Sequence, residues 1–334
     1  MRPRVVLGFS GGVDSAVTAR LLTMQGWDVR CVYLETGSGE GGYARESARR
    51  MGLPFEEIDA RAALESEVCA PFEAAYLAGA TPSPCVLCNR RVKLKLLCEA
   101  ADALGIERIA TGHYAAARAG AIFRGRPEND QSYMLCLVTR SQARRLVLPL
   151  GGYAKREVRE MAADFGLMQA QKPDSMEICF IKDGDFAAWI ESRGHAPGEG
   201  ALIYNGERVG THGGVHRYTL GQRRGLGFAA GRRVFVSEIR PDTNEVVLAD
   251  GDGLYETHIR TGAANWLINA PRGEFSCLVR VRHSRALTPA RARAAEDGAL
   301  DISFERPVRA PAPGQAAALY AGDMLIAGGI IAGN

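Results

Sequence analysis

Three cysteines stand in sequence contexts that favour thiol chemistry. Cys85 and Cys88 lie three residues apart in TPSPCVLCN, and Cys179 lies in a second block, KPDSMEICF. The helix expected after the pair begins with three basic residues, Arg90, Arg91 and Lys93. A helix N-terminus and nearby positive charge stabilise the thiolate, which is the reactive form. One CxxC pair is also compatible with a redox pair, half of a zinc site or two structural cysteines.

A glycine-rich segment near the start of the chain is suited to hold an anion. The segment is Ser10-Gly11-Gly12-Val13-Asp14-Ser15, between an expected strand and an expected helix. Glycines let backbone amides approach a phosphate, and a helix N-terminus favours negative charge. The Asp14 carboxylate is suited to hold Mg²⁺ against a pyrophosphate. The same residues also make a plain strand-to-helix turn.

Composition excludes several classes of protein. The chain has 334 residues, 46% hydrophobic and 24% charged, with a net charge of +3, which indicates about two or three globular domains. No run approaches the ~20 apolar residues of a membrane helix, and the first residues lack a signal-peptide layout, so a cytoplasmic protein without a membrane partner is expected. None of the five lysines follows a glycine, which excludes the Walker-type phosphate loop. The eight cysteines are not expected to form a disulfide framework, and those in apolar stretches are expected to be buried: Cys31, Cys98, Cys136 and Cys277.

The elements that must position these residues follow from hydrophobic spacing. Strand and helix patterns alternate over the first ~115 residues, which favours a parallel sheet covered by helices. The expected elements are strands at 5–7, 29–34, 55–58 and from 109, and helices from 13, at 90–104 and at 155–165. After about residue 195 hairpin signals replace this pattern, at Asn205-Gly206 and at Asp242-Thr243-Asn244. We therefore predict an α/β protein with a Rossmann-like parallel-sheet domain (1–190), a small mixed domain (191–262) and a C-terminal β-barrel (263–334).

Several blocks together resemble a known family. SGGVDS resembles the PP-loop of the N-type ATP pyrophosphatases. The further blocks are TPSPCVLCN, TGHY (111–114), DQSY (130–133), KPDSMEICF, YTLGQRRGLG (218–227), PGQ (313–315) and GGII (328–331). In this order, over nearly the whole chain, they resemble the tRNA-specific 2-thiouridylase family.

The resemblance implies an ATP-dependent tRNA sulfurtransferase. ATP would adenylate the C2 oxygen of the wobble uridine in the anticodon arm, with release of pyrophosphate and later AMP. Cys179 would carry a persulfide received from a sulfur-relay protein or a cysteine desulfurase. Cys88 would then form a disulfide with Cys179 and free the sulfur. Cys85 is a third thiol where many members have aspartate.

The resemblance also implies binding residues. Those expected at ATP are Gly8, Phe9, Ser10, Gly11, Gly12, Val13, Asp14, Ser15, Leu34 and Gly112. Those expected at tRNA are Ser83, Pro84, Cys85, His113, Asn129, Asp130, Gln131, Arg282, His283 and Gln315. The chain departs from the family pattern at Ser83, Asn129, Glu177 and the pair Arg282-His283. Arg223 and Arg224 are suited to bind phosphate, although an arginine pair is more often a solvated surface.

Four alternatives remain open from the sequence. Cys85, Cys88 and Cys179 are enough thiols to ligate a [4Fe–4S] cluster with an open iron, as in related PP-loop enzymes. An ATP-dependent amide ligase shares the loop but needs neither CxxC nor Cys179. A G-x-G-x-x-G pattern at 37–42, with Asp59 about 20 residues on, fits a dinucleotide-dependent oxidoreductase. A non-enzymatic tRNA-binding relative is the fourth.

Overall fold

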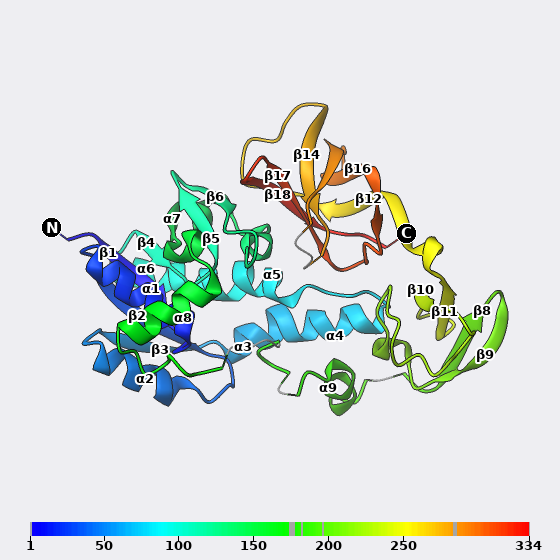
Figure 1. Cartoon of the computed structure of the whole chain (residues 1–334), viewed down its shortest axis with the longest axis horizontal. Helices are drawn as coiled ribbons and strands as arrows, with labels where there is room; N and C mark the ends of the chain where they lie inside the picture. Colours follow the sequence, from blue (N-terminus) through cyan, green and yellow to red (C-terminus); the bar gives the residue numbers. More distant parts are fainter. Residues whose placement is uncertain (1, 174–177, 182, 196, 283–285, 334) are drawn as a thin grey trace.

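The computed structural model describes residues 2–173, 178–181, 183–195, 197–282 and 286–333. The described residues form three sheets, and the third combines C-terminal strands with a hairpin from the first part of the chain (Figure 1). Within these residues no helix has the length and apolar character needed to cross a membrane.

The first sheet is parallel and has the order β3-β2-β1-β4-β7. Its strands are β1 (Arg4–Gly8), β2 (Asp28–Glu35), β3 (Phe55–Asp59), β4 (Arg108–Ala110) and β7 (Leu146–Val147). The helices α1 (Val13–Met24), α2 (Gly41–Arg50), α6 (Leu94–Ala103) and α8 (Lys155–Asp164) belong to the same domain. Strand order reverses at β1, and in such sheets ligands bind outside the carboxyl ends of the strands at this point. The glycine-rich segment follows β1 there, as the alternating pattern predicted.

Two helical runs connect β3 to β4. The first combines α3 (Arg61–Leu64), a π-helical turn η1 (Glu65–Cys69) and α4 (Ala70–Leu77). The second combines α5 (Pro84–Cys88), a π-helical turn η2 (Asn89–Lys93) and α6. The expected start of this helix near residue 90 is therefore wrong, because proline at the first helical position needs no N–H partner and has a helical φ. Cys85 and Cys88 consequently lie within the first turns of the helix.

The second sheet has the order β10-β11-β8-β9, and its hairpins turn where predicted. Its strands are β8 (Gly200–Tyr204), β9 (Glu207–His212), β10 (Val234–Arg240) and β11 (Glu245–Asp250). Asn205 and Gly206 have φ of 52° and 80° between β8 and β9, as a tight hairpin turn requires. The helix α9 (Phe186–Ser192) precedes this sheet.

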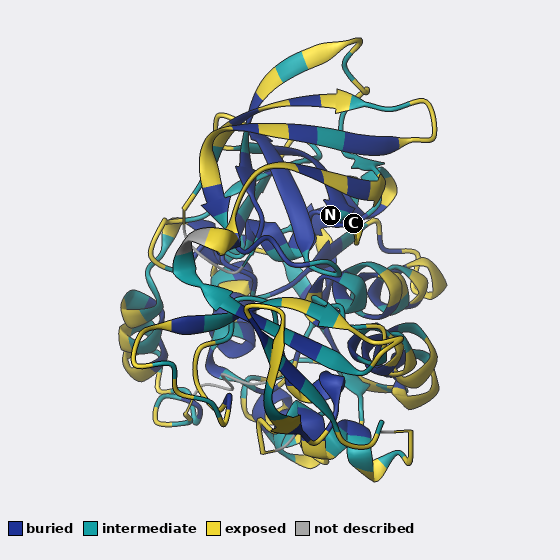
Figure 2. Cartoon of the chain, turned by 90° about the vertical axis from the view of Figure 1, so that its right-hand side faces the viewer, coloured by how far each residue is buried: buried dark blue, intermediate teal, exposed yellow. Residues whose placement is uncertain are grey.

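The third sheet contains the C-terminal strands and a hairpin from the first domain. Its order is β12 (Tyr255–Ala263), β16 (Ala299–Arg309), β15 (Thr288–Ala294), β14 (Glu274–Arg280), β17 (Ala316–Ala321), β18 (Met324–Ile330), β6 (Ala121–Arg124) and β5 (Ala115–Arg118), with β13 (Asn265–Trp266) paired to β18. A bridge between Thr261 and Ile331 joins β12 to the chain after β18, so the C-terminal strands close around their own apolar core. Buried and exposed residues alternate along β15, whereas most residues of β17 and β18 are buried; Figure 2 colours the chain by burial. The sheet already begins at Tyr255, within the range expected for the central domain.

Candidate active site

The glycine-rich segment forms a tight turn at the carboxyl end of β1. Gly11 has φ of +73°, and a Cβ there would lie 2.9 Å from the Ala44 Cα, so both conformation and space require glycine. The Ser15 hydroxyl donates to the carbonyl of Gly12 at 3.0 Å. Among the described residues no side chain caps the N-terminus of α1 at Gly12. The amides of this first turn are thus available to an anion.

Other residues expected at ATP surround this turn. A Cβ on Gly112 would lie 3.1 Å from the Asp14 Cβ, so the chain after β4 approaches the loop closely. Leu34 lies near the end of β2 and packs beside the thiol-bearing helix in the cluster that includes Cys88. Phe9 is buried in the core, where its side chain serves packing. The structure therefore gathers the loop, Leu34 and Gly112 at one edge of the sheet.

Asp14 is held by two residues that sequence reasoning missed. Lys155, the first residue of α8, donates from Nζ to both carboxylate oxygens at 2.6 and 2.7 Å. The Tyr114 hydroxyl donates to Oδ1 at 2.6 Å. The Asp14 oxygens thus accept from an ammonium group and a phenol, and Asp14 as a ligand of Mg²⁺ stays a prediction. The sequence signal for Lys155 was weak: it is one of five lysines, and it opens an amphipathic helix.

The three candidate thiols share one electrostatic environment. Cys85 and Cys179 are exposed and Cys88 is half-buried. Surrounding protein nevertheless desolvates the Cys179 thiol and raises its pKa to about 11, the Cys88 and Cys85 thiols add to the rise, and Lys93 opposes it. Burial also raises the pKa of Cys85, against the charge of Lys93. Of the basic residues expected to act on these thiols, Lys93 does so, whereas Arg91 pairs with Glu67 at 3.2 Å.

These thiols do not form a metal site in the structure. Within residues 2–173, 178–181, 183–195, 197–282 and 286–333, no group of three or more histidine, cysteine, aspartate or glutamate side chains is arranged to hold a metal ion. The thiols that ligate a [4Fe–4S] cluster lie farther apart than the ligands of a single ion, so a cluster on Cys85, Cys88 and Cys179 stays a prediction. Of the cysteines expected to be buried, Cys98 is instead half-buried.

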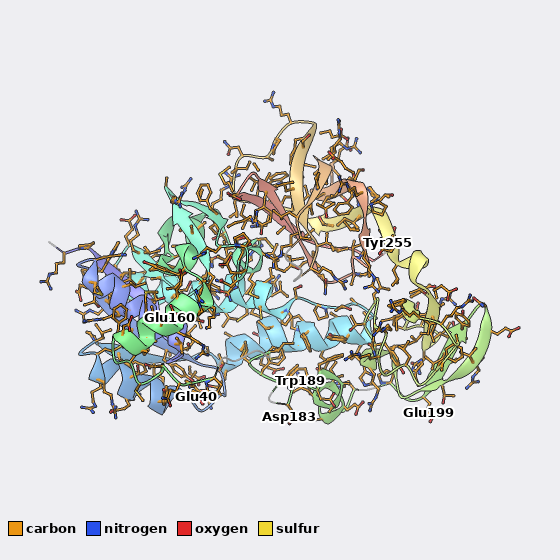
Figure 3. All side chains as sticks on the ribbon, viewed as in Figure 1. Glu40, Glu160, Asp183, Trp189, Glu199 and Tyr255 are labelled. Atoms are coloured by element: carbon orange, nitrogen blue, oxygen red, sulfur yellow. The ribbon has the colours of Figure 1, made fainter. Side chains whose placement is uncertain are left out.

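An aromatic cluster holds the segment that carries Cys179 against α4. Phe180 packs on Phe72 of α4 with ring centroids 5.4 Å apart and on Trp189 of α9 at 5.2 Å. Ile181 is buried in the same cluster. Figure 3 shows Trp189 on α9, where its ring lies 5.8 Å from that of Phe72. Cys179 is therefore presented on a short segment whose neighbours are anchored on both sides.

Ion pairs hold the chain that follows α9 against α4. Glu73 of α4 is buried and accepts from the Arg193 Nε at 2.6 Å and from the His195 Nδ1 at 2.9 Å. Burial alone would raise the pKa of Glu73, but these hydrogen bonds outweigh it and hold the pKa below its usual range. Glu191 of α9 contacts the buried His216 of the central domain at 2.9 Å and also pairs with Arg217. No sequence pattern indicated these contacts, because their partners lie 25 to 122 residues apart.

Several residues expected at tRNA have structural partners. His113 is buried and its Nδ1 lies 2.7 Å from the Thr111 hydroxyl. Burial and the charge of Lys93 lower its pKa to about 3, so the imidazole is neutral. Asp130 is buried against Arg280 at 3.1 Å.

The side-chain amides of Gln131 and Asn129 also make hydrogen bonds to the backbone of the catalytic-domain fold. The side-chain oxygen of Gln131 accepts from the backbone N–H of Tyr114 at 3.0 Å. Asn129 donates to the carbonyl of Tyr153 at 3.3 Å. The structure thus brings Asn129, Asp130, Gln131 and His113 together around the chain after β4.

Other tRNA candidates lie where the C-terminal domain meets α5. The backbone N–H of Ala316, next to Gln315, lies 3.4 Å from the Ser83 hydroxyl. Thr81 donates to the carbonyl of Pro313 at 2.7 Å. Burial and the positive charge of the neighbouring Arg309 lower the pKa of Arg282, an arrangement that favours an anion. His283 lies outside the described residues.

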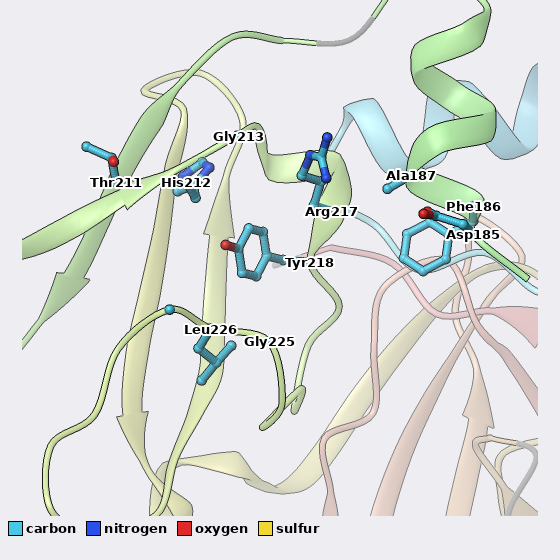
Figure 4. Close-up of a pocket in the computed structure, with 11 residues that line it drawn as sticks. Asp185, Phe186, Ala187, Thr211, His212, Gly213, Arg217, Tyr218, Gly225 and Leu226 are labelled. Atoms are coloured by element: carbon cyan, nitrogen blue, oxygen red, sulfur yellow. The ribbon is translucent and has the colours of Figure 1, made fainter.

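A cavity of about 490 Å³ lies between the start of α9 and the central domain (Figure 4). We call it the central recess; its lining is Asp185, Phe186, Ala187, Thr211, His212, Gly213, Arg217, Tyr218, Gly225, Leu226 and Gly227. None of the residues expected at ATP, tRNA or the thiols lines it.

Comparisons with known proteins cover the whole chain. Residues 3–183 match a family described as tRNA methyl transferase HUP domain, 191–250 its PRC-barrel domain, and 256–331 an aminomethyltransferase beta-barrel domain. The tRNA-specific 2-thiouridylase MnmA of Carboxydothermus hydrogenoformans is 37% identical over 99% of this chain and 98% of its own. That of Heliobacterium modesticaldum is 38% identical over 100% and 94%.

A solved complex of a 4-thiouridine synthetase with RNA and ATP is 17% identical over 57% of this chain and 50% of that chain, with a TM-score of 0.37, which is too low to carry an argument. The curated relatives, by contrast, are similar from end to end, and the expected family resemblance is confirmed. The chain belongs to the tRNA-specific 2-thiouridylase family.

Proposed function

We propose that the protein is an ATP-dependent sulfurtransferase that replaces the C2 oxygen of the wobble uridine of tRNA with sulfur. The observation that carries this proposal is the proximity of Cys88 and Cys179: Phe180, next to Cys179, packs in the same apolar cluster as Cys88, and the Cys88 thiol helps to raise the pKa of Cys179. Cys88 also shares an apolar cluster with Leu34, at the edge of the sheet where the anion loop lies. An amide ligase needs no such pair of thiols.

The loop between β1 and α1 supports the activation step. The uridine C2 oxygen attacks the α-phosphorus of ATP, the bond to the β-phosphate oxygen breaks, and pyrophosphate leaves. The free amides at the start of α1 and the hydroxyls of Ser10 and Ser15 suit the departing pyrophosphate. The oxygen on C2 thereby becomes part of a good leaving group, AMP.

The two thiols support the transfer step. A sulfur-relay protein or cysteine desulfurase supplies a persulfide on Cys179, whose terminal sulfur attacks C2 and displaces AMP. The Cys88 thiolate then attacks the Cys179 Sγ, the bond from Sγ to the transferred sulfur breaks, and a Cys88–Cys179 disulfide forms. The new sulfur stays on C2. An external thiol reductant returns both cysteines to the starting state.

ATP is a substrate in this scheme, and no step is routed through Mg²⁺ on Asp14 or through an iron–sulfur cluster. Ser83, Pro84 and Cys85 are the proposed contacts of the target base. Gln315 and Arg282 are proposed to contact the tRNA from the C-terminal domain, the latter because its positive charge lies beside that of Arg309. The domain limits 1–190, 191–262 and 263–334 stay a prediction, with the strand β12 of the third sheet already beginning at Tyr255.

Nucleoside mass spectrometry tests the proposal. Unmodified tRNA is incubated anaerobically with protein, ATP, Mg²⁺ and a persulfide donor, and 2-thiouridine is measured. We expect product from the wild type and none from Cys88→Ser or Cys179→Ser. Cys98→Ser is the matched control and should keep activity. AMP formation without any thiouridine, from either persulfide or sulfide, would refute the proposal and indicate another adenylated substrate.

A further inference from the structure

A loop of the central domain carries an unusual concentration of free positive charge. Residues 222–233, the arginine loop, contain four arginines and no acidic residue. All four are exposed. Arg232 pairs with Asp250 at 3.1 Å. In the part of the chain that the structure describes, the guanidinium groups of Arg223, Arg224 and Arg233 have no hydrogen-bond or ion-pair partner.

The arginine loop is held in place although its charges are free. The carbonyl of Gln222 accepts from the backbone N–H of Val236 at 2.9 Å. Leu226 is buried in the core of the central domain, and the ring of Phe228 lies 5.4 Å from that of Tyr204. Anchored apolar residues therefore alternate with exposed arginines, so little conformational entropy is lost when an anion binds.

The loop borders the central recess, close to the cysteine that carries sulfur. Gly225 and Leu226 line one side, and Asp185, Phe186 and Ala187 line the other (Figure 4). The Asp185 carboxylate is occupied in capping α9, where it accepts from the Ala188 amide at 2.9 Å. Six residues separate Asp185 from Cys179, a span of at most about 20 Å. A polymer bound at Cys179 can therefore extend to the recess.

We propose that the arginine loop and the central recess bind the ribose–phosphate backbone of the tRNA, away from the target uridine. This inference rests on the proposed function. Guanidinium groups make forked hydrogen bonds to phosphate, and exposed unpaired ones release counterions when a polyanion binds. Backbone contacts of this kind fix the position of the tRNA and do not read its sequence.

Fluorescence anisotropy of labelled tRNA as a function of salt tests the proposal. The variant replaces Arg223, Arg224 and Arg233 with glutamine. Its slope of log affinity against log salt should fall by about 2, since each single-strand phosphate contact contributes roughly 0.7. Affinity at low salt should fall at least about tenfold, while replacement of all three by lysine should keep most of the slope.

The matched control is Arg291→Gln, which removes an exposed arginine of the C-terminal sheet that pairs with Glu274 at 2.9 Å. It should leave the slope unchanged. In the glutamine variant, the KM for tRNA should rise while ATP affinity stays within about twofold of wild type, because the loop does not contact ATP.

Unchanged affinity and slope in the glutamine variant would overturn the inference. So would normal tRNA binding combined with slower loading of persulfide onto Cys179, which would assign the surface to a protein partner. Failure of the proposed function gives a different result: the wild type would bind tRNA through the arginine loop and yet form no 2-thiouridine.

Discussion

Replacement of Lys155 by methionine removes the ammonium group that holds Asp14 beside the anion loop. The Nζ atom lies 2.6 and 2.7 Å from the two carboxylate oxygens, and the side chains of Lys155 and Asp14 are 29% and 32% exposed. A hydrogen bond to a charged group contributes about 1.5–3 kcal/mol. Both hydrogen bonds come from one ammonium group, so we count this energy once. The loss corresponds to about 10- to 100-fold in kcat/KM for ATP.

The physical reason is electrostatic. Without the ammonium group, the Asp14 carboxylate places negative charge next to the position proposed for the triphosphate. Pyrophosphate released in the presence of tRNA, measured against ATP concentration, gives kcat/KM. Lys95→Met is the matched control, because Lys95 lies 4.0 Å from Glu99 on an exposed helix face.

An unchanged kcat/KM for ATP in Lys155→Met would refute the reasoning. An equal loss of tRNA affinity would also refute it, since it would indicate a general change in the fold. A double-mutant cycle with Asp14→Asn isolates the pair, and additive losses would show that the two side chains act separately.

Three further predictions follow from buried or paired groups. Alkylation of Cys179 by iodoacetamide should accelerate with pH up to about 11, because only the thiolate reacts and the pKa is raised to that value; peptide mass mapping that shows a plateau near pH 8 would contradict it. Asp130→Ala should lower the free energy of unfolding by about 3–5 kcal/mol, because it removes the buried carboxylate that pairs with the buried Arg280; a normal denaturant midpoint with weakened tRNA binding would instead place Asp130 at the RNA. Glu191→Gln, which weakens the contact of α9 with His216, should slow thiouridine formation several-fold and leave pyrophosphate release unchanged. Equal losses in both rates would argue against a positioning role.

Hydrophobic spacing predicted the parallel sheet well because β1 and its neighbours are short apolar runs between helical patterns. It missed β15, whose sequence is TPARARA. Alanine has low strand propensity, but in this strand Ala290 and Ala292 face the core while arginines alternate outward. Neighbouring strands supply the burial that the residue types alone do not indicate.

The hairpin β5–β6 shows a second limit. Its residues follow β4 and were expected to belong to the first domain, yet Phe123 pairs with Met324 of β18. A sheet that joins segments about 200 residues apart leaves no periodic signal in either segment.

The candidate site shows the same difference between residues that local sequence identifies and residues that only the structure identifies. The loop from Ser10 to Ser15, the CxxC pair and Cys179 were all found from residue type and local spacing, because anion binding by a glycine turn and thiol reactivity depend on chemistry within a few residues. Lys155 was missed as a partner of Asp14, which lies 141 residues away.

Residue chemistry and local backbone preference are properties of short stretches of chain, so the amino-acid order alone indicated which groups could react and where most strands and helices of the first domain lie. Proximity is a property of packing. The approach of Cys179 to Cys88 depends on the docking of Phe180 and α9 against α4. The free charge of the arginine loop depends on where acidic groups lie, because within the described residues Asp250 pairs with Arg232 and not with the other three arginines. Only the tertiary structure determines such distances. They depend on contacts between segments that are far apart in the sequence, and no local sequence pattern encodes those contacts.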